Sequence, residues 1–431
     1  MTRLRTRLKS SSIRLRSPRL FAIWFTRLAW LLIGTIALAE TKVDLSRLVV
    51  VGDSLSAGFQ NHSLLDSQQV NGYASLVAQQ AQVALPLPLI GPPGIPNVLE
   101  LVSFGPPPVI VTALGLSTGR DNPAIQAMNL AVPGANVQDT LTARPAFTFD
   151  NLIDFVLGLP GVFAGVSQSQ VEWAEHLAPT TIVIWIGNND ALGAAVAADA
   201  SLLTPLADFQ AAYAQVITRL RATGATLVVA NIPDVTTIPF LTPAETVAAQ
   251  IGLPLFVIGP ILGIGPGDFV TPGAFPLIPA ILAKPALGPL PANVVLDAGE
   301  VAAIQSAVDA YNAFIAAQAQ ANGAALVDIH TLVSRFQQQG VVVGGQQLTT
   351  GFLGGLFSLD GVHPTNTGYA LIGNEFIKTI NTSFAADIPP VSVEQIENND
   401  PLIPSRSGRP ASALGHISPE SVQSLRRVIV H

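Results

Sequence analysis

The chain has 431 residues, of which 49% are hydrophobic and 11% are charged, with a formal net charge of −7 and no cysteine. A chain of this length buries a sizeable core in one large domain or in two ordinary ones. The lack of cysteine excludes disulfide bonds, thiolate metal ligands, a cysteine nucleophile and a lipidated cysteine.

Residues 1–39 predict an export signal. They hold eight basic side chains and no acidic one, then an apolar run at 28–36, and then an Ala-Leu-Ala sequence that ends at Ala39. This order is typical of a signal peptide cleaved after Ala39, and the lack of a twin arginine in it favours general secretion. An uncleaved anchor stays open, because residues 20–39 are long enough to span a bilayer, although Arg27 opposes insertion. We expect a secreted or periplasmic protein.

All 28 acidic side chains lie after residue 39, so the body of the protein is acidic. An acidic surface repels the phosphates of nucleic acids. We therefore expect neither DNA nor RNA as a partner.

Short apolar runs alternate with helical patterns along the rest of the chain. This alternation predicts an α/β fold in which helices cover both faces of a mainly parallel sheet. Five runs show no polar alternation, as expected of strands buried on both sides. They lie at residues 48–51, 129–132, 181–186, 226–230 and 325–329. Helices are predicted at residues 73–83, 170–176, 209–222, 299–320 and 367–380.

Two proline-rich apolar insertions interrupt this alternation. Residues 85–108 carry eight prolines. Residues 251–291 carry nine prolines and seven glycines, and the only charges of this second insertion are Asp268 and Lys284. Proline this dense excludes a regular helix or a central strand. For 85–108, a surface connection packed on the body is favoured. For 251–291, the same packing and a cap that offers an apolar surface to a lipid-like substrate both stay open.

The C-terminal residues 386–431 are polar, contain scattered prolines and show no periodicity. They predict a largely disordered tail or a surface wrap. The chain thus divides into a signal peptide (1–39), one domain (40–385) with the insertions at about 85–108 and 251–291, and this tail.

Residues that could take part in catalysis follow three of the predicted strands. Ser54 of Gly-Asp-Ser-Leu comes after the first strand, at the edge where open α/β sheets bind ligands, and its backbone N–H is a ready oxyanion donor. Gly134 follows the second strand and leaves another backbone N–H at this edge. Asn189 of Gly-Asn-Asn-Asp follows the third strand, where its amide can face a developing oxyanion. The alternative role of Asn189 is to cap the next helix, which we assign to Asp190 instead.

The sequence Asp-Gly-Val-His places the carboxylate of Asp360 three residues before His363. Across one turn, such a carboxylate reaches the ring Nδ1, fixes the tautomer and leaves Nε2 free as a base. In this order, the four motifs resemble the SGNH/GDSL hydrolase family, and the resemblance extends over residues 44–384. It implies a flavodoxin-like three-layer α/β/α sandwich with a five-stranded sheet, and serine ester hydrolysis without a cofactor.

The resemblance also implies a role for each motif residue. Ser54 is then the nucleophile, His363 the general base and Asp360 the residue that orients His363. The oxyanion hole consists of the backbone N–H groups of Ser54 and Gly134 and the side-chain amide of Asn189.

A second serine fits a nucleophile pattern. Ser117 lies in Gly-Leu-Ser-Thr-Gly, which matches the G-x-S-x-G sequence of nucleophile elbows, and the preceding run 109–114 is a strand candidate. The next strand candidate follows too soon for the helix that an elbow needs. Ser54 is therefore favoured over Ser117.

The remaining histidines have ordinary interpretations. His176 is expected on the solvated face of a helix, and His330 is expected to have a structural or rim role at a strand end. His62 lies just beyond Ser54 and is a weaker candidate for a substrate contact. Since no group of His, Asp and Glu has the spacing of metal ligands, no metal is predicted.

These observations predict a secreted esterase or lipase-like hydrolase that cleaves acyl esters through an acyl-enzyme on Ser54. The expected partners are a small-molecule or lipid-like ester and, transiently, a lipid surface, and we expect a monomer. Two alternatives share the fold, an acyltransferase and a carbohydrate deacetylase. A third is a non-catalytic secreted protein that binds a partner through residues 251–291, but binding alone requires none of the four motifs.

Overall fold

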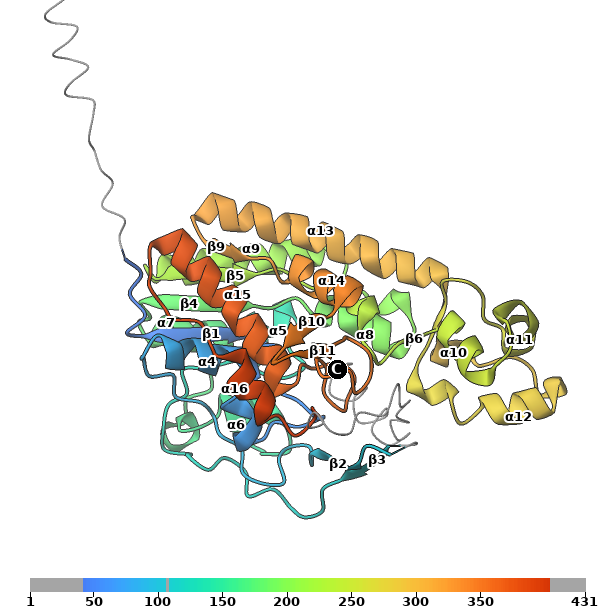
Figure 1. The fold of residues 1–431 in the computed structure, drawn as a ribbon. Coiled ribbons are helices and arrows are strands. Elements are labelled where there is room, and N and C mark those ends of the chain that lie inside the picture. Colours follow the sequence, from blue (N-terminus) through green and yellow to red (C-terminus); the bar gives the residue numbers. More distant parts are fainter. Residues whose placement is uncertain (1–41, 106–107, 404–431) are drawn as a thin grey trace, which may run out of the picture. The chain divides into compact units, whose positions relative to one another are not determined.

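A computed structural model of the protein describes residues 42–105 and 108–403. The predicted signal peptide at 1–39 lies outside the described residues. Four parallel strands form the central sheet in the spatial order β1-β4-β5-β9 (Figure 1). They are β1 (Leu48–Gly52), β4 (Thr181–Trp185), β5 (Thr226–Ala230) and β9 (Ala325–Val327). The register pairs Leu48 with Thr181 and Val228 with Ala325.

The predicted strand at 129–132 forms only an isolated parallel bridge, between Asn129 and Val50. It nevertheless runs beside β1, because the Val50 N–H donates to the Met128 carbonyl and the Leu130 N–H donates to the Val50 carbonyl, both at 2.9 Å. The Val132 N–H also donates to the Gly52 carbonyl, but regular pairing is incomplete because the Gly52 N–H donates to the Gln170 side chain instead of to this segment. The fold class is therefore confirmed, with four regular strands and this segment in the fifth position. The spatial order is that of a flavodoxin-like sheet.

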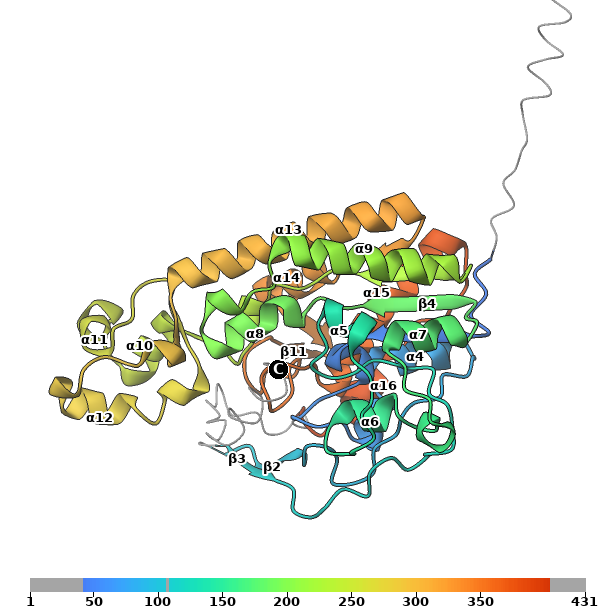
Figure 2. The same cartoon turned by 180° about the vertical axis from the view of Figure 1, so that it is seen from behind.

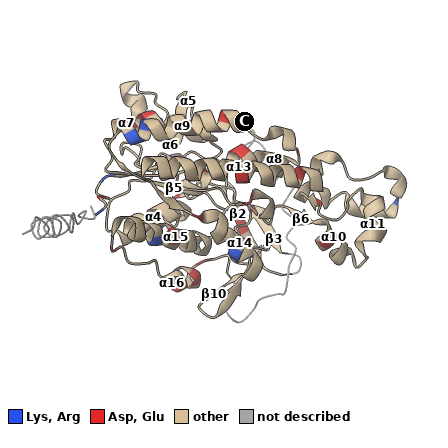
Figure 3. Cartoon of the chain, turned by 90° about the horizontal axis from the view of Figure 1, so that it is seen from above, with Lys and Arg blue, Asp and Glu red and all other residues tan. Residues whose placement is uncertain are grey.

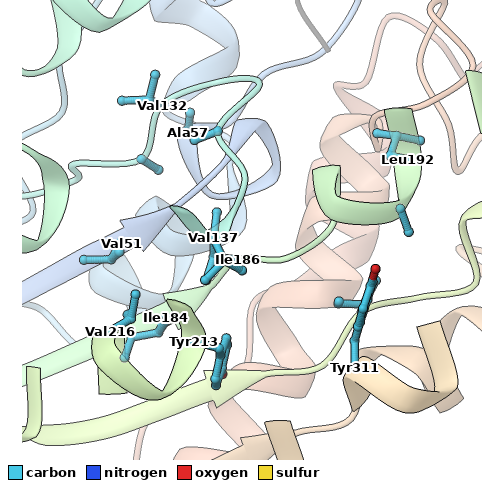
Figure 4. Packing of buried hydrophobic residues seen from close by; sticks show 14 of the residues in the cluster. Val51, Ala57, Val132, Val137, Ile184, Ile186, Leu192, Tyr213, Val216 and Tyr311 are labelled. Atoms are coloured by element: carbon cyan, nitrogen blue, oxygen red, sulfur yellow. The ribbon is translucent and has the colours of Figure 1, made fainter. Parts of the chain in front are cut away.

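Side chains of each strand alternate between two hydrophobic cores. Val49, Val51 and Ile184 face one core, and Val50 and Val183 face the other. The first core is covered by α5 (Val137–Thr142), α7 (Gln170–His176), α9 (Leu206–Ala222) and α13 (Ala298–Asn322), and Figure 4 shows part of its packing. The second core is covered by α4 (Tyr73–Gln80), α14 (Ile329–Gln339) and α15 (Asn366–Phe384). Figures 1 and 2 show these layers from opposite sides.

Several element ends follow from local capping. Ser169 and Glu172 form a capping box at the start of α7, and Asp297 and Glu300 form one at the start of α13. The predicted strand 325–329 is two residues too long, because Asp328 accepts the Thr331 N–H and caps α14. Helix α4 likewise ends at Gln80, three residues before its predicted end.

The smaller elements connect this framework. The remaining α-helices are α2 (Ser54–Ala57), α3 (Asp66–Gln69), α6 (Leu152–Val156), α8 (Asn189–Ala197), α10 (Ala244–Ile251), α11 (Leu255–Leu262), α12 (Ile278–Ala283) and α16 (Val393–Asn398). The remaining strands are β2 (Leu99–Ser103) with β3 (Val109–Thr112), β6 (Thr242–Pro243) with β7 (Phe269–Val270) and β8 (Val295–Leu296), and β10 (Val341–Val343) with β11 (Gln346–Leu348).

The two insertions differ in how they pack. In 85–108, Ile90, Val98 and Leu99 are buried, so this segment packs on the body as predicted. The prediction that 251–291 contains no regular helix is wrong, because α11 and α12 form there. In α12 the proline lies in the first turn, where an N–H has no partner in the helix. Helix α11 begins after Pro254 and forms although Pro260 inside it lacks the N–H for one helical hydrogen bond.

Together with α10, this second insertion forms a separate core, and we call residues 244–294 the apolar lobe. The buried hydrophobic residues of this core are Ala244, Val247, Ala248, Ile258, Leu262, Ile264, Val270, Ala274, Ile278, Ile281, Leu290 and Val294. Figure 1 shows α10, α11 and α12 standing apart from the helices that cover the sheet. The lobe is therefore neither a connection that packs on the body nor a segment without structure.

Residues 386–403 are ordered along α15, so the disordered-tail prediction is wrong for this part and the surface wrap describes it. The Asp400 carboxylate accepts the N–H and the hydroxyl of Thr367, and Asn374 exchanges two hydrogen bonds with the backbone of Val391. Such side-chain bonds to a neighbouring segment leave no periodicity in the sequence, and the helix in this part, α16, has only 6 residues. Residues 404–431 lie outside the described residues.

Candidate active site

Ser54 lies at the carboxyl end of β1, at the first position of α2. Asp53 caps this short helix, since its Oδ1 accepts the Leu55 N–H at 3.0 Å. The end of β1 is fixed from α7, where the buried Gln170 Oε1 accepts the Gly52 N–H at 2.9 Å. Ser54 is thus held between a strand end and a helix start, and it is 6% exposed.

An unbroken hydrogen-bonded chain joins Ser54, His363 and Asp360. His363 Nε2 lies 2.8 Å from Ser54 Oγ, and His363 Nδ1 lies 2.9 Å from Asp360 Oδ2. All three residues are buried. Because Nδ1 faces a carboxylate, it carries the proton, and Nε2 presents its lone pair to the serine hydroxyl. The structure thus brings together the three residues that the sequence predicted as a unit.

Asp360 is held as a carboxylate by donors within its own turn. Its Oδ1 accepts the N–H groups of Val362 and His363, both at 2.9 Å, and the hydroxyl of Ser358 at 3.1 Å. Burial opposes the ionisation of Asp360, but the interaction with His363 and these hydrogen bonds outweigh it. Together they hold the pKa of Asp360 well below its ordinary value of 3.8. The carboxylate is therefore charged wherever His363 acts as a base.

A second segment, just after α2, also holds Asp360. The His62 N–H donates to Asp360 Oδ2 at 2.8 Å, and Asn61 Oδ1 accepts the Leu359 N–H at 3.0 Å. Asn61 and His62 both have left-handed backbone conformations, with φ of 52° and 62°. Among residues other than glycine, Asn and His adopt this conformation most readily, and the hydrogen bonds to Asp360 and Leu359 hold the segment in it.

The predicted oxyanion donors lie beside this chain. Asn189 is the first residue of α8, and its Nδ2 donates to the Ala135 carbonyl at 2.8 Å, which places the side chain next to Gly134. Gly134 has φ of +86°, a conformation that glycine adopts without strain. Among the described residues, the N–H groups of Ser54 and Gly134 have no acceptor. The two backbone N–H groups and the second N–H of the Asn189 amide are therefore available to an oxyanion.

Asp190 does not cap α8 as predicted. The N-cap residue is Asn188, and Asp190 Oδ2 instead accepts the Val137 N–H at the start of α5, at 3.0 Å. Burial raises the pKa of Asp190 to about 7, and the charges of Asp139 and Asp53 act in the same direction. The carboxyl group thus ties α8 to α5 from a buried position.

Asp53 has a structural partner that sequence reasoning missed. Asn188 Nδ2 donates to Asp53 Oδ2 at 2.8 Å, which links the first motif to the third. Burial raises the pKa of Asp53 to about 6, although this hydrogen bond and the one from the Leu55 N–H lower it. Gln170, Asn188 and the His62 N–H carried no recognisable signal in the sequence, because their partners lie more than 100 residues away.

An apolar cavity of about 70 Å³ opens at Ser54. Ser54, Asn189 and His363 line one part of it, and the apolar residues around them include Trp185, Leu192, Phe336 and Ile372. None of the described residues that line it lies in 251–291, so the structure does not place that insertion over the cavity as a cap. A second cavity, of about 500 Å³, is lined by Gly134 together with polar residues such as Asp139 and Gln170. Of the three predicted oxyanion donors, Ser54 and Asn189 thus line the apolar cavity and Gly134 lines the more polar one.

The other sequence candidates lie apart from this chain. The Ser117 hydroxyl donates to the Gly91 carbonyl at 3.2 Å, and the preceding β3 belongs to the hairpin with β2 and not to the central sheet. His176 is exposed, and His330 Nδ1 lies 3.1 Å from the Ile232 carbonyl. The His62 ring is buried, and burial lowers its pKa to about 4. Within residues 42–105 and 108–403, no three His, Asp or Glu side chains form a group that could hold a metal ion.

Comparison with known proteins identifies a family for this chain. The family model for GDSL-like Lipase/Acylhydrolase matches residues 48–376. No curated protein matches the chain in sequence. Similar solved structures include an alpha/beta hydrolase enzyme from the metagenome of Lake Arreo, with 14% identity, a TM-score of 0.36, and coverage of 79% of this chain and 96% of that one. The esterase EstA from Pseudoalteromonas sp. has 12% identity and a TM-score of 0.33, with coverage of 79% and 100%. An acetyl xylan esterase from Geobacillus stearothermophilus has 12% identity and a TM-score of 0.34, with coverage of 79% and 96%.

Proposed function

We propose that this chain, which belongs to the GDSL-like lipase/acylhydrolase family, cleaves carboxylic esters through an acyl-enzyme on Ser54. The observation that carries the proposal is the hydrogen-bonded chain from Ser54 Oγ through His363 to Asp360. Three available donors beside the serine complete the arrangement that acyl transfer requires. A protein that only binds a partner needs none of these contacts.

The reaction follows from the positions of the protons. His363 Nε2 takes the proton of Ser54 Oγ as the oxygen attacks the ester carbonyl, and the N–H groups of Ser54 and Gly134 and the Asn189 amide stabilise the oxyanion. Asp360 stabilises the imidazolium that forms. His363 then protonates the departing alcohol, and a water molecule repeats the sequence on the acyl-enzyme to release the acid.

The cavity supports an ester with an apolar part as the substrate. Apart from the reacting residues, its walls at Trp185, Leu192, Phe336 and Ile372 offer apolar surface. Each methylene group that enters such a site contributes about 0.8 kcal/mol, or roughly a fourfold change in kcat/KM. Nitrophenyl esters of increasing acyl length test this: kcat/KM should rise from acetate to butyrate. A preference for acetate that is unchanged in Phe336→Ala would favour a deacetylase. An added alcohol that captures the acyl group faster than water would favour a transferase.

Labelling with a fluorophosphonate tests the nucleophile directly. Ser54→Ala should abolish both ester hydrolysis and labelling, and Ser117→Ala, as the matched control, should leave both intact. Labelling that survives Ser54→Ala and disappears in Ser117→Ala would contradict the proposed mechanism.

We also propose that the protein is exported, which rests on the pattern of residues 1–39. N-terminal sequencing of the protein produced in a secreting host should find Glu40 as the first residue. A mature protein that starts at Met1 and stays with the membrane fraction would favour the uncleaved anchor.

A further inference from the structure

Residues 251–291 of the apolar lobe expose a surface that almost lacks polar side chains, whereas the exposed polar residues of the lobe, such as Glu245 and Gln250, lie outside this segment. Within 251–291, all of which the structure describes, Lys284 is the only exposed residue with a polar side chain. Phe256 is 81% exposed, Leu287 is 58% exposed and Leu253 is 46% exposed. Figure 3 shows acidic residues at many positions of the body and few charged residues on α11 and its surroundings.

These side chains are not needed for the lobe to fold. The core of the lobe is built from other residues, among them Ile258, Leu262 and Ile278. Asp268, the second charge of the segment, is used internally, since its two oxygens accept the N–H groups of Ala298 and Gly265. The exposed apolar side chains therefore gain nothing from the fold, and a surface of this kind marks an interaction site.

The composition of this surface identifies the chemistry of its partner. Interfaces between proteins carry about one hydrogen bond per 100–200 Å² and are enriched in aromatic residues, Met and Arg. The exposed part of 251–291 offers a single polar side chain, Lys284, and the nine prolines of the segment have no N–H to donate. A hydrocarbon phase requires no hydrogen bonds, and it favours a surface that leaves few polar groups to desolvate.

We propose that the apolar lobe docks the protein on an uncharged lipid surface. The exposed side chains around α11, including Phe256, enter the boundary between headgroups and acyl chains. The acidic body stays in water, and its charge disfavours an anionic membrane. Among the described residues, no single helix is long and apolar enough to span a bilayer, and only the α10–α11 pair, bent by 108°, meets that criterion in combination.

Sedimentation with vesicles tests the proposal on the full chain. Vesicles of diether phosphatidylcholine have no ester to hydrolyse, so the measurement is independent of the proposed enzymatic activity. The wild-type protein should sediment with them. Phe256→Ser should lower the partition coefficient about tenfold, and Leu253→Ser should lower it less, because less of its side chain is exposed. Turnover of nitrophenyl acetate should stay unchanged in both variants.

A matched control is available outside the lobe. Phe163 is 73% exposed, and Phe163→Ser should leave vesicle binding unchanged. Equal loss of binding in Phe163→Ser and Phe256→Ser, or no binding by the wild type, would overturn the proposal. A protein dimer that forms without lipid and disappears in Phe256→Ser would also overturn it, in favour of a second copy as the partner.

Discussion

The buried carboxyl group of Asp190 makes the stability of the fold depend on pH. Burial raises its pKa from 3.8 to about 7 in the folded protein. The folded state therefore binds this proton more tightly than the unfolded chain does. The stability that this proton contributes is fully present below about pH 4 and is lost as the pH rises toward and through 7.

The size of the effect follows from this pKa. The pKa difference between the folded and unfolded states corresponds to about 4 kcal/mol in the free energy of unfolding. About 3 kcal/mol of this is lost between pH 5 and pH 9. Asp190→Asn removes the charge and keeps an oxygen that can accept the Val137 N–H. Between pH 5 and pH 9, we expect the free energy of unfolding of the variant to rise by about 3 kcal/mol relative to that of the wild type.

Urea unfolding of both proteins at pH 5 and pH 9 measures this gain. The difference between the two proteins isolates Asp190 from the other carboxyl groups that titrate in the same range. Asp387→Asn is a control at an exposed position and should follow the wild type at both pH values. If Asp190→Asn shows the same loss of stability as the wild type between pH 5 and pH 9, the ionisation of Asp190 is not its cause.

Three further predictions concern the site and the lobe. Asn189→Ala should lower kcat by about 10²–10³ with little change in KM, because the donor acts mainly in the transition state, and an effect on KM alone would make Asn189 a substrate-binding residue. Asn61→Gly keeps the left-handed backbone but leaves the buried Leu359 N–H without its acceptor. It should cost about 1–3 kcal/mol in thermal unfolding, and an unchanged Tm would contradict this. Ile258→Ser should lower the Tm, since this side chain is fully buried, and an unchanged Tm would mean that the core of the lobe is not formed.

The parts of the fold that could be predicted from the sequence are those with local signals. Strands β1, β4 and β5 are continuous apolar runs, and a run of this kind needs burial on both faces wherever the sheet forms. The Asp360–His363 contact spans three residues, so one turn is enough to form it. Ser54 and Asn189 follow strands directly, and the ends of parallel strands meet at one edge.

Contacts between distant segments could not be predicted in the same way. The hydrogen bond from the His62 N–H to Asp360 forms only because two loops that are distant in the sequence lie side by side in the fold. Neither residue has a local sequence pattern that predicts it. Asp190 illustrates the resulting error. In sequence it has the position of a helix cap, but its carboxylate bonds to Val137, which lies 53 residues earlier on another helix. Capping propensity describes what a side chain can do locally, and the packed structure decides between that bond and a distant one.

The apolar lobe shows a related limit of sequence reasoning. Leu253, Phe256 and Ile258 have similar hydrophobicity, and the hydrophobic effect has no direction, so composition alone cannot assign them to a core, a cap or an outer surface. The structure separates them, because Ile258 is buried in the core of the lobe while Leu253 and Phe256 face solvent. A variant that changes all three would combine a loss of stability with a loss of surface contact. Single changes measure the two effects separately, because a change at Ile258 affects folding and a change at Phe256 affects lipid binding.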